Sequence, residues 1–310
     1  MTVNVLFAHD KAQWEIYQGP LQKALEAVGV EATLSREMPP EGVDYIIYAP
    51  SSWLQDFTPY TRAKAVLNLW AGVEAITGNE TLKIPLARMV DYGLRQGMVE
   101  WVTGHVLRHH LDIDFFLRHQ EGDWLPKVPP LARDRRVTVL GLGELGSACA
   151  KALAGLDFSV SGWSRSPKQI EGITCHSGTD GLRQALEKAD ILVLLLPFTA
   201  ATENVLNAES LGWMPDGAVV INPGRGQLID DDALLDALGT GKIGHATLDV
   251  FRTEPLPADH PYWGRPNVTV TPHIASETRP ETASEVIAEN IRRGEAGEPF
   301  LHLVNRDLGY

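Results

Sequence analysis

The feature that most constrains the fold of this chain is a glycine-rich turn, GLGELG, between a short apolar strand and a helix. Its glycines are Gly141, Gly143 and Gly146, and the strand is predicted over Val137–Leu140. In such a unit the first glycine permits a tight turn, the second lets a pyrophosphate approach the backbone, and the third lets the helix pack on the strand. The helix N-terminus offers N–H groups to phosphate. The turn therefore predicts a dinucleotide site, with an ordinary glycine-rich βα turn as the alternative.

Strands alternate with helices along the whole sequence, which predicts an α/β fold with parallel sheets. The series of elements before the glycine-rich turn includes a short helix expected near Pro59–Ala65. It closes with a long stretch of apolar residues at helical spacing, Met98–Arg118, which predicts one helix. A second series starts at Val137, and a last helix is expected near Arg279–Arg293.

Each series is long enough to form its own sheet, so two Rossmann-like or flavodoxin-like domains are expected. The predicted long helix and the segment near 275 are the natural crossing points between them. We therefore expect a discontinuous substrate-binding domain, residues 1–96 and 277–310, with a dinucleotide-binding domain, residues 97–276, inserted in it.

Composition narrows the class of partner. The formal net charge is −13, which disfavours nucleic acid and anionic membranes as partners but not a small anionic substrate. No apolar run approaches the ~20 residues of a membrane span. The sequence has two cysteines, Cys149 and Cys175, and its start shows no signal-peptide pattern, so a reducing, cytoplasmic location is expected.

The strand after the glycine-rich turn ends without the carboxylate that usually holds the ribose of NAD. The sequence there is GWSRSPK, and it offers Ser164, Arg165, Ser166 and Lys168. Hydroxyl, guanidinium and ammonium groups suit a 2′-phosphate, with arginine as the strong partner. The pattern predicts a preference for NADPH over NADH, with a solvated basic turn as the alternative.

Three charged residues follow in order: Arg225 in INPGRGQLID, Glu254 in FRTEPLP and His273 in TPHIAS. Arg225 comes after a buried strand, at the edge of a parallel sheet where ligands bind. A guanidinium can hold a carboxylate and polarise a carbonyl, and a histidine beside a carboxylate can donate a proton near neutral pH. Each residue alone would equally suit a structural position. A metal is not expected, because His105, His109 and His110 lack a convincing ligand set nearby.

These motifs together resemble the D-isomer-specific 2-hydroxyacid dehydrogenases over nearly the whole length. The resemblance rests on GLGELG, LLLPFTAATENVLN, INPGRGQLIDDDALLDAL, LDVFRTEPLP and TPHIASET, which are highly specific in this order. Within the family the chain is most similar to the glyoxylate/hydroxypyruvate reductase A type, because of GWSRS, LWAGVE and the end VNRDLGY.

The resemblance implies a role for each matching position. Arg225 would bind the carboxylate and the carbonyl oxygen of the substrate, His273 would be the general acid, and Glu254 would orient it. Backbone N–H groups of the loop after Trp70 would bind the carboxylate, through Ala71, Gly72 and Val73. The cofactor side would comprise Gly141, Gly143, Glu144, Leu145, Gly146, Leu196, Pro197, Thr202, Asn222, Pro223, Gly224 and Asp249.

Two positions depart from the family pattern. Trp70 stands where a small residue is usual, so an indole could narrow the substrate pocket or turn away from it. Glu144 lies among the expected phosphate-binding residues, where an acid gives no benefit, so we expect its side chain to point outward.

The leading hypothesis is an NADPH-dependent reductase of small 2-keto acids such as glyoxylate and hydroxypyruvate. Two alternatives remain: a non-catalytic dinucleotide sensor or corepressor on the same fold, and a D-lactate- or phosphoglycerate-type dehydrogenase. The family resemblance and the apolar residues of Met98–Arg118, among them Val102, Val106, Phe115 and Phe116, further predict a homodimer built on this helix and the proline-rich loop after it.

Overall fold

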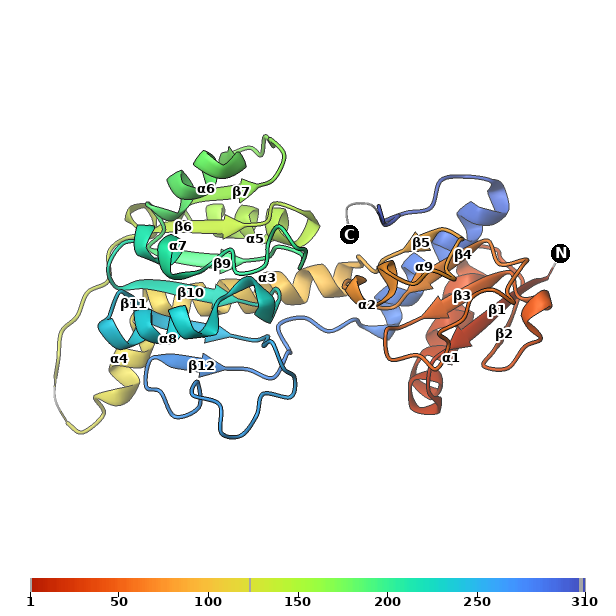
Figure 1. Ribbon diagram of the computed structural model, residues 1–310, viewed down its shortest axis with the longest axis horizontal. Helices are drawn as coiled ribbons and strands as arrows, with labels where there is room; N and C mark the ends of the chain where they lie inside the picture. The colour runs from red at the N-terminus through yellow and green to blue at the C-terminus, as the bar shows by residue number, and fades with distance from the viewer. Residues whose placement is uncertain (1, 123, 307–308, 310) are drawn as a thin grey trace. The chain divides into compact units, whose positions relative to one another are not determined.

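The chain folds into two compact α/β units. A computed structural model describes residues 2–122, 124–306 and 309. The first unit comprises Met1–Leu94 and Glu277–Tyr310, and the second comprises Arg95–Ser276 (Figure 1). Each unit contains one parallel sheet, which confirms the predicted fold class. Among the described residues, no helix has both the length and the apolar character that a membrane crossing requires.

The first unit is built on a five-stranded sheet of order β2-β1-β3-β4-β5. All neighbouring strands in it are parallel. This order is that of flavodoxin-like folds. The strands are β1 Val3–Ala8, β2 Ala32–Ser35, β3 Tyr45–Tyr48, β4 Ala65–Asn68 and β5 Leu86–Ala87.

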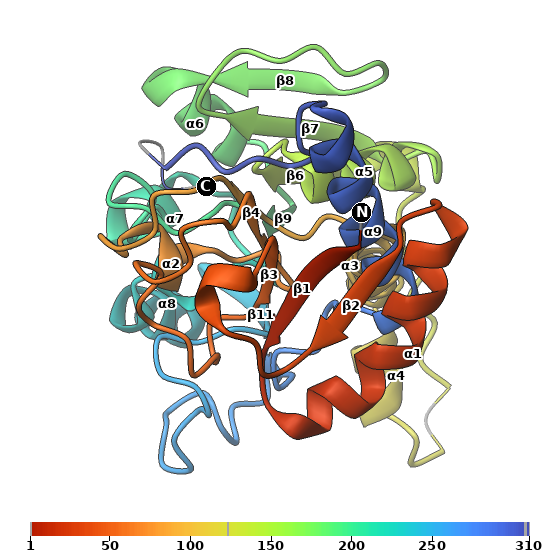
Figure 2. The same ribbon diagram turned by 90° about the vertical axis from the view of Figure 1, so that its right-hand side faces the viewer.

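Helices cover both faces of this sheet. Helices α1 (Lys11–Ala27) and α9 (Pro280–Ala296) pack on one face, and the short α2 (Glu74–Thr77) packs on the other with the loop around Phe57 (Figure 2). The buried residues of α9 recur at helical spacing, which is why this segment returns to the N-terminal sheet. A short 3₁₀ turn, η1, spans Pro40–Gly42.

The second unit is built on a seven-stranded sheet of order β12-β11-β10-β9-β6-β7-β8. Counted from β6, the order is that of the dinucleotide-binding fold with one further strand, and it reverses between β6 and β9. Ligands of such sheets bind at the reversal, outside the carboxyl ends of the strands. The strands are β6 Arg136–Leu140, β7 Ser159–Ser164, β8 Thr174–Ser177, β9 Ile191–Leu194, β10 Ala218–Asn222, β11 Ile243–Leu248 and β12 Val268–Val270.

Two separate hydrophobic clusters attach the helices to this sheet. One face is covered by α5 (Glu144–Ala154) and by the buried residues Met98, Val102 and Val106 of α3. The opposite face is covered by a set of three helices. These are α6 Gly178–Leu186, α7 Ala208–Trp213 and α8 Asp231–Thr240.

Two predicted helices are wrong. The stretch Met98–Arg118 is not one helix: α3 spans Tyr92–His110, Asp112 adopts a left-handed conformation with φ of 53°, and α4 spans Ile113–Arg118. Apolar spacing continues across the break, so periodicity alone does not reveal it. No helix forms over 59–65, where Tyr60 and Ala63 are instead buried in a turn against the sheet.

Candidate active site

The glycine-rich turn connects β6 to α5 at the point where the strand order reverses. Gly141 has φ of +104°, a conformation that favours glycine. A Cβ on Gly146 would overlap the carbonyl oxygen of Gly141. Within the described residues, a Cβ on Gly143 would meet nothing within 4 Å, so the backbone is open at this position. Glu144, at the start of α5, is exposed, in agreement with the expectation that it points outward.

The basic turn after β7 lies beside the glycine-rich turn. The Lys168 ammonium donates to the carbonyl of Leu142 at 2.6 Å, so its positive charge is held at the open backbone of that turn. Arg165 and Ser166 are exposed. Ser164 is buried, and its hydroxyl donates to the carbonyl of Ser166 at 2.8 Å. Ser164 thus shapes the turn, while the side chains of the other three residues reach the surface.

The loops after β9 and β10 border the same edge of the sheet. Thr202 donates its hydroxyl to the Pro197 carbonyl at 2.7 Å, which folds the β9 loop back on itself, and Leu196 is buried beside it. A Cβ on Gly224 would lie 2.8 Å from the carbonyl oxygen of Leu194, so the two loops are in close contact. The predicted cofactor residues of these loops are therefore neighbours.

Arg225 is positioned by its own turn. The buried Asn222 side chain donates to the Arg225 carbonyl at 2.9 Å and accepts from the Gly224 N–H at 3.1 Å. The half-buried guanidinium of Arg225 donates to the Gly224 carbonyl at 2.6 Å. The next residue, Gly226, packs directly on the backbone of Phe251. The turn that bears Arg225 therefore lies against the loop that bears Glu254.

His273 and Glu254 form a hydrogen-bonded pair. Nδ1 of His273 lies 2.7 Å from Oε2 of Glu254, and the other carboxylate oxygen accepts from the Phe251 N–H at 2.8 Å. The glutamate is thus fixed to its own loop, and it holds the imidazole by one nitrogen. The His273 side chain is 52% exposed, and its contact with Glu254 uses Nδ1 and not Nε2.

Asp249 is a positioning residue that sequence reasoning had placed only on the cofactor side. It is fully buried, and its carboxylate accepts from the Thr271 hydroxyl at 2.6 Å and from the N–H groups of Ile274 and Ala275 at 2.9 and 2.8 Å. Its carbonyl accepts from the His273 N–H at 2.8 Å. Asp249 therefore fixes the backbone of His273 and the residues before and after it in the sequence. The φ of His273 is 55°, which is uncommon outside glycine.

In the first unit, hydrogen bonds from neighbouring side chains to its carbonyl groups hold the loop Leu69–Val73 in place. The buried Asn68 amide donates to the carbonyls of Trp70 and Gly72 at 2.7 and 3.0 Å, and Thr278 donates to that of Leu69 at 2.9 Å. Among the described residues, no acceptor pairs with the N–H groups of Ala71, Gly72 or Val73. The loop therefore presents donors, the polarity that an anion requires.

The C-terminal segment supports this loop from the other end of α2. The Arg306 guanidinium donates to the carbonyls of Thr77, Asn79 and Leu82. A cation at the end of a helix satisfies its last carbonyls. Sequence reasoning had noted VNRDLGY as a family marker only. A contact between residues more than 220 positions apart leaves no local signal.

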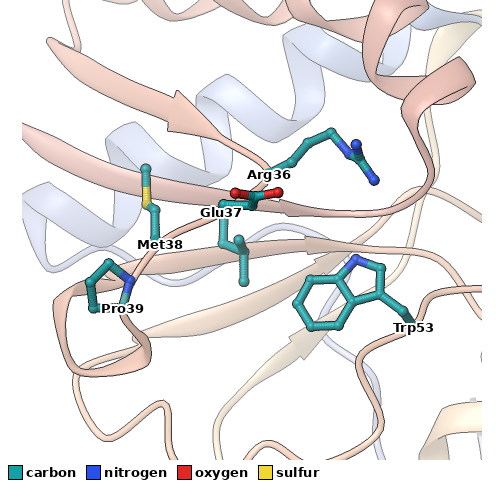
Figure 3. A pocket seen from close by; sticks show the side chains of 6 residues that line it. Arg36, Glu37, Met38, Pro39 and Trp53 are labelled. Atoms are coloured by element: carbon teal, nitrogen blue, oxygen red, sulfur yellow. The ribbon is translucent and has the colours of Figure 1, made fainter.

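An open pocket of about 560 Å³ in the first unit contains none of the predicted site residues. It lies beside β1 and is lined by Leu6, Arg36, Glu37, Met38, Pro39 and Trp53 (Figure 3). The Arg36 guanidinium donates to the His9 carbonyl at 3.1 Å. We therefore do not include this pocket in the candidate site.

Comparison with known proteins identifies the family of the chain. Residues 104–275 match the family model described as D-isomer specific 2-hydroxyacid dehydrogenase, NAD binding domain. The glyoxylate/hydroxypyruvate reductase A of Serratia proteamaculans is 37% identical, over 99% of this chain and 100% of that protein. The corresponding protein of Yersinia enterocolitica is 34% identical over the same shares of the two chains.

Solved structures show the same likeness. A D-isomer specific 2-hydroxyacid dehydrogenase from Xanthobacter autotrophicus Py2, in complex with NADPH and MES, is 41% identical with a TM-score of 0.92 over 100% of both chains. An NADPH-dependent glyoxylate/hydroxypyruvate reductase from Sinorhizobium meliloti, in complex with NADP and sulfate, is 31% identical with a TM-score of 0.85 over 100% of this chain and 99% of that one. The chain belongs to the D-isomer-specific 2-hydroxyacid dehydrogenase family.

Proposed function

We propose that the chain catalyses the NADPH-dependent reduction of small 2-keto acids, such as glyoxylate and hydroxypyruvate, to 2-hydroxy acids. The observation that carries the proposal is the His273–Glu254 pair, 2.7 Å apart, on the loops that follow β11 and β12. The glycine-rich turn and Arg225 follow other strands of the same sheet, so all of these groups lie at its carboxyl edge. The relatives with this name support the choice of substrate.

The residues present fit a phosphorylated dinucleotide. The backbone is open at Gly143, α5 starts there, and the Lys168 ammonium is held at the same turn. In this proposal the second unit holds NADPH, with Arg165, Ser166 and Lys168 at the 2′-phosphate. When bound, NADPH supplies the hydride. Family members solved with NADPH and NADP support this choice of cofactor.

The chain's own groups then bind the keto acid and stabilise the negative charge that develops on its carbonyl oxygen. Arg225 binds the carboxylate, and the N–H groups of residues 71–73 in the first unit are donors of the kind that suits an anion. Arg225 also faces the carbonyl oxygen and stabilises the negative charge that develops on it. Protonated His273 gives its proton to that oxygen, and Glu254 holds the imidazole in position while it does so.

A substrate panel tests the proposal. We expect kcat/KM to be higher for glyoxylate and hydroxypyruvate than for branched or aromatic keto acids, because in this proposal the Trp70 indole takes up room where a small residue is usual. The measurement is initial rates for glyoxylate, hydroxypyruvate, pyruvate and phenylpyruvate with NADPH and with NADH. A chain that binds NADPH but turns over none of them would be a dinucleotide sensor. Faster reduction of phenylpyruvate than of glyoxylate would place Trp70 outside the pocket.

Arg165→Ala should erode the preference for NADPH. A hydrogen bond to a charged group is worth about 1.5–3 kcal/mol, so KM for NADPH should rise roughly 10- to 150-fold while KM for NADH stays nearly constant. Arg183→Ala is the matched control, because Arg183 is an exposed arginine paired with Glu187 on α6. Equal kcat/KM for the two cofactors in the unmutated protein would refute the assigned preference.

Two glycines of one turn should respond differently to alanine. Gly143→Ala adds a methyl group where the chain leaves open space, so the melting temperature should hold while NADPH binding weakens about tenfold or more, about 1.4 kcal/mol. Gly146→Ala forces a methyl group onto the Gly141 carbonyl and should lower stability by about 1–3 kcal/mol or more. Thermal melts and NADPH titration of both variants measure the difference. Unchanged NADPH affinity in Gly143→Ala would argue against phosphate binding there.

The proposal includes a homodimer, with a corrected contact surface. Val102 and Val106, expected on that surface, lie instead in the core beneath α3. The exposed apolar side chains follow the helix break, and Trp124 and Val128 are 95% and 90% exposed. Large exposed apolar side chains in one segment are typical of an interaction surface.

Val128→Glu should therefore dissociate the dimer, because a carboxylate is costly to bury in an apolar contact. Light scattering at micromolar concentration should fall from twice 34.0 kDa to 34.0 kDa. Leu156→Glu is the control, since Leu156 is an exposed leucine outside this segment. A monomeric mass for the unmutated protein would disprove the dimer.

A further inference from the structure

Three potential ligand groups converge where the break between α3 and α4 meets the sheet of the second unit. They belong to His109 on α3, Asp114 on α4 and His245 on β11. One donor atom from each lies within 4.8 Å of the others. They line a pocket of about 230 Å³. The helical neighbours of His109 do not form a ligand set, because the residues that complete the group lie beyond the helix break and on a distant strand.

The two imidazoles are oriented by threonine hydroxyls. Nε2 of His109 lies 2.9 Å from Oγ1 of Thr247, and Nε2 of His245 lies 2.9 Å from Oγ1 of Thr269. If each Nε2–H donates to its threonine, Nδ1 of each ring carries the free lone pair. Such outer partners, which fix ring orientation and tautomer, are a regular feature of metal-binding histidines.

The carboxylate of Asp114 has one oxygen in use and one without a partner. Oδ1 accepts from Nε of Arg108 and lies 2.8 Å from its Nη2. Oδ2 is buried and makes no hydrogen bond among the described residues. A buried acceptor without a donor is rare and calls for a bound water or ion. Two imidazole rings and a carboxylate with an unpaired oxygen therefore meet at this point, each with an atom within 4.8 Å of the others.

The charged side chains that line this pocket are Arg108, Asp112, Asp114, Arg118 and Lys127. Arg108 is neutralised by Asp114 itself, and Lys127 pairs with Asp112 at 2.9 Å. Arg118, at the end of α4, is exposed to solvent. Burial is the largest cause that lowers the pKa of His109 to about 3 and that of His245 to about 4, so both rings are neutral near pH 7. Neutral imidazole is the form that binds metal.

We propose that Nδ1 of His109, Nδ1 of His245 and Oδ2 of Asp114 bind one divalent transition-metal ion of the Zn²⁺ class, with water as the fourth ligand. Two nitrogens and one oxygen suit this class. His245 lies near the amino end of β11, whereas the groups of the candidate active site follow the carboxyl ends of the strands. The ion is therefore structural: it fastens α4 to the sheet beyond the helix break. This inference does not depend on the proposed function.

Isothermal titration of the full-length, untagged protein with ZnCl₂ tests the site, after removal of metal by a chelator and of the chelator by dialysis. We expect one equivalent of Zn²⁺ to bind and to raise the melting temperature, and Co²⁺ to give the visible absorption of a tetrahedral site. His245→Gln and Asp114→Asn should abolish the binding of this equivalent of Zn²⁺ and leave the rate of glyoxylate reduction unchanged. His176→Gln, which changes a histidine outside the cluster, should retain it.

Thr269→Val keeps all three ligands and removes only the partner of His245. Zn²⁺ affinity should fall about 10- to 100-fold in this variant, the usual cost of losing an outer-shell partner. The Zn²⁺ affinity of Thr269→Val tests the site even if the Asp114→Asn variant fails to fold. If no stoichiometric Zn²⁺ binding were found, the space between the three side chains would be assigned to water, and the proposal would be overturned. Retention of the equivalent in His245→Gln, with its loss in Glu254→Gln, would place the ion at His273 instead and also overturn it.

Discussion

His273→Ala is expected to lower kcat for keto acid reduction about 10²- to 10⁴-fold, the usual contribution of a positioned proton donor. NADPH affinity should change little, because the imidazole acts on the substrate oxygen. The loss should fall on kcat at saturating NADPH, measured by initial rates with glyoxylate. His176→Gln, a change at a histidine on β8, is the control for general effects of histidine loss.

The pH dependence separates a proton donor from a merely structural histidine. Reduction requires charged His273 and oxidation requires the neutral ring, so kcat/KM for reduction should fall as pH rises and that for oxidation should rise. Glu254→Gln keeps a hydrogen-bonding group beside Nδ1 but removes the carboxylate, so kcat for reduction should fall while NADPH affinity changes little. An active His273→Ala protein with an unchanged pH profile would show that the proton comes from another group.

Arg225→Lys is expected to lower kcat/KM about 10²- to 10³-fold, the range found when one group that stabilises a developing oxyanion is lost. A lysine retains the charge, but its ammonium cannot reproduce the planar, two-pronged grip of a guanidinium on a carboxylate and a carbonyl. In the proposed mechanism Arg225 holds the substrate as well as the developing charge, so KM for the keto acid should rise and kcat should fall together.

The control for this variant is Arg183→Lys, the same exchange at an exposed arginine on α6. NADPH affinity should remain within about twofold in both variants. If Arg225→Lys raised KM for NADPH and left KM for glyoxylate unchanged, Arg225 would belong to the cofactor side, and the assignment of the carboxylate grip would be wrong.

Local sequence was sufficient for the glycine-rich turn and most of the elements around it. The strand predicted over Val137–Leu140 is found as β6, Arg136–Leu140, and α9 starts within one residue of the N-terminus expected for the last helix. The reason is that strand and helix periodicities, and the absence of side chains at Gly141 and Gly146, act within a few residues of one another. The break at Asp112 is not visible in the same periodicity. Asp112 and Asp114 pair with Lys127 and Arg108, and the apolar pattern runs on across it.

The sequence was enough to predict a proton donor, its carboxylate partner and a guanidinium from the order and context of Arg225, Glu254 and His273. Each of these side-chain types suits one of the three chemical roles. Only the tertiary structure decided how they are held. The 2.7 Å contact of Glu254 with His273 and the clamp of Asp249 on both sides of His273 arise because parallel strands bring distant loops to one edge of a sheet. The same holds for Arg306 at α2 and for His245 beside His109 and Asp114. Contacts between residues far apart in the chain follow from strand order and packing, and neither is visible in local sequence.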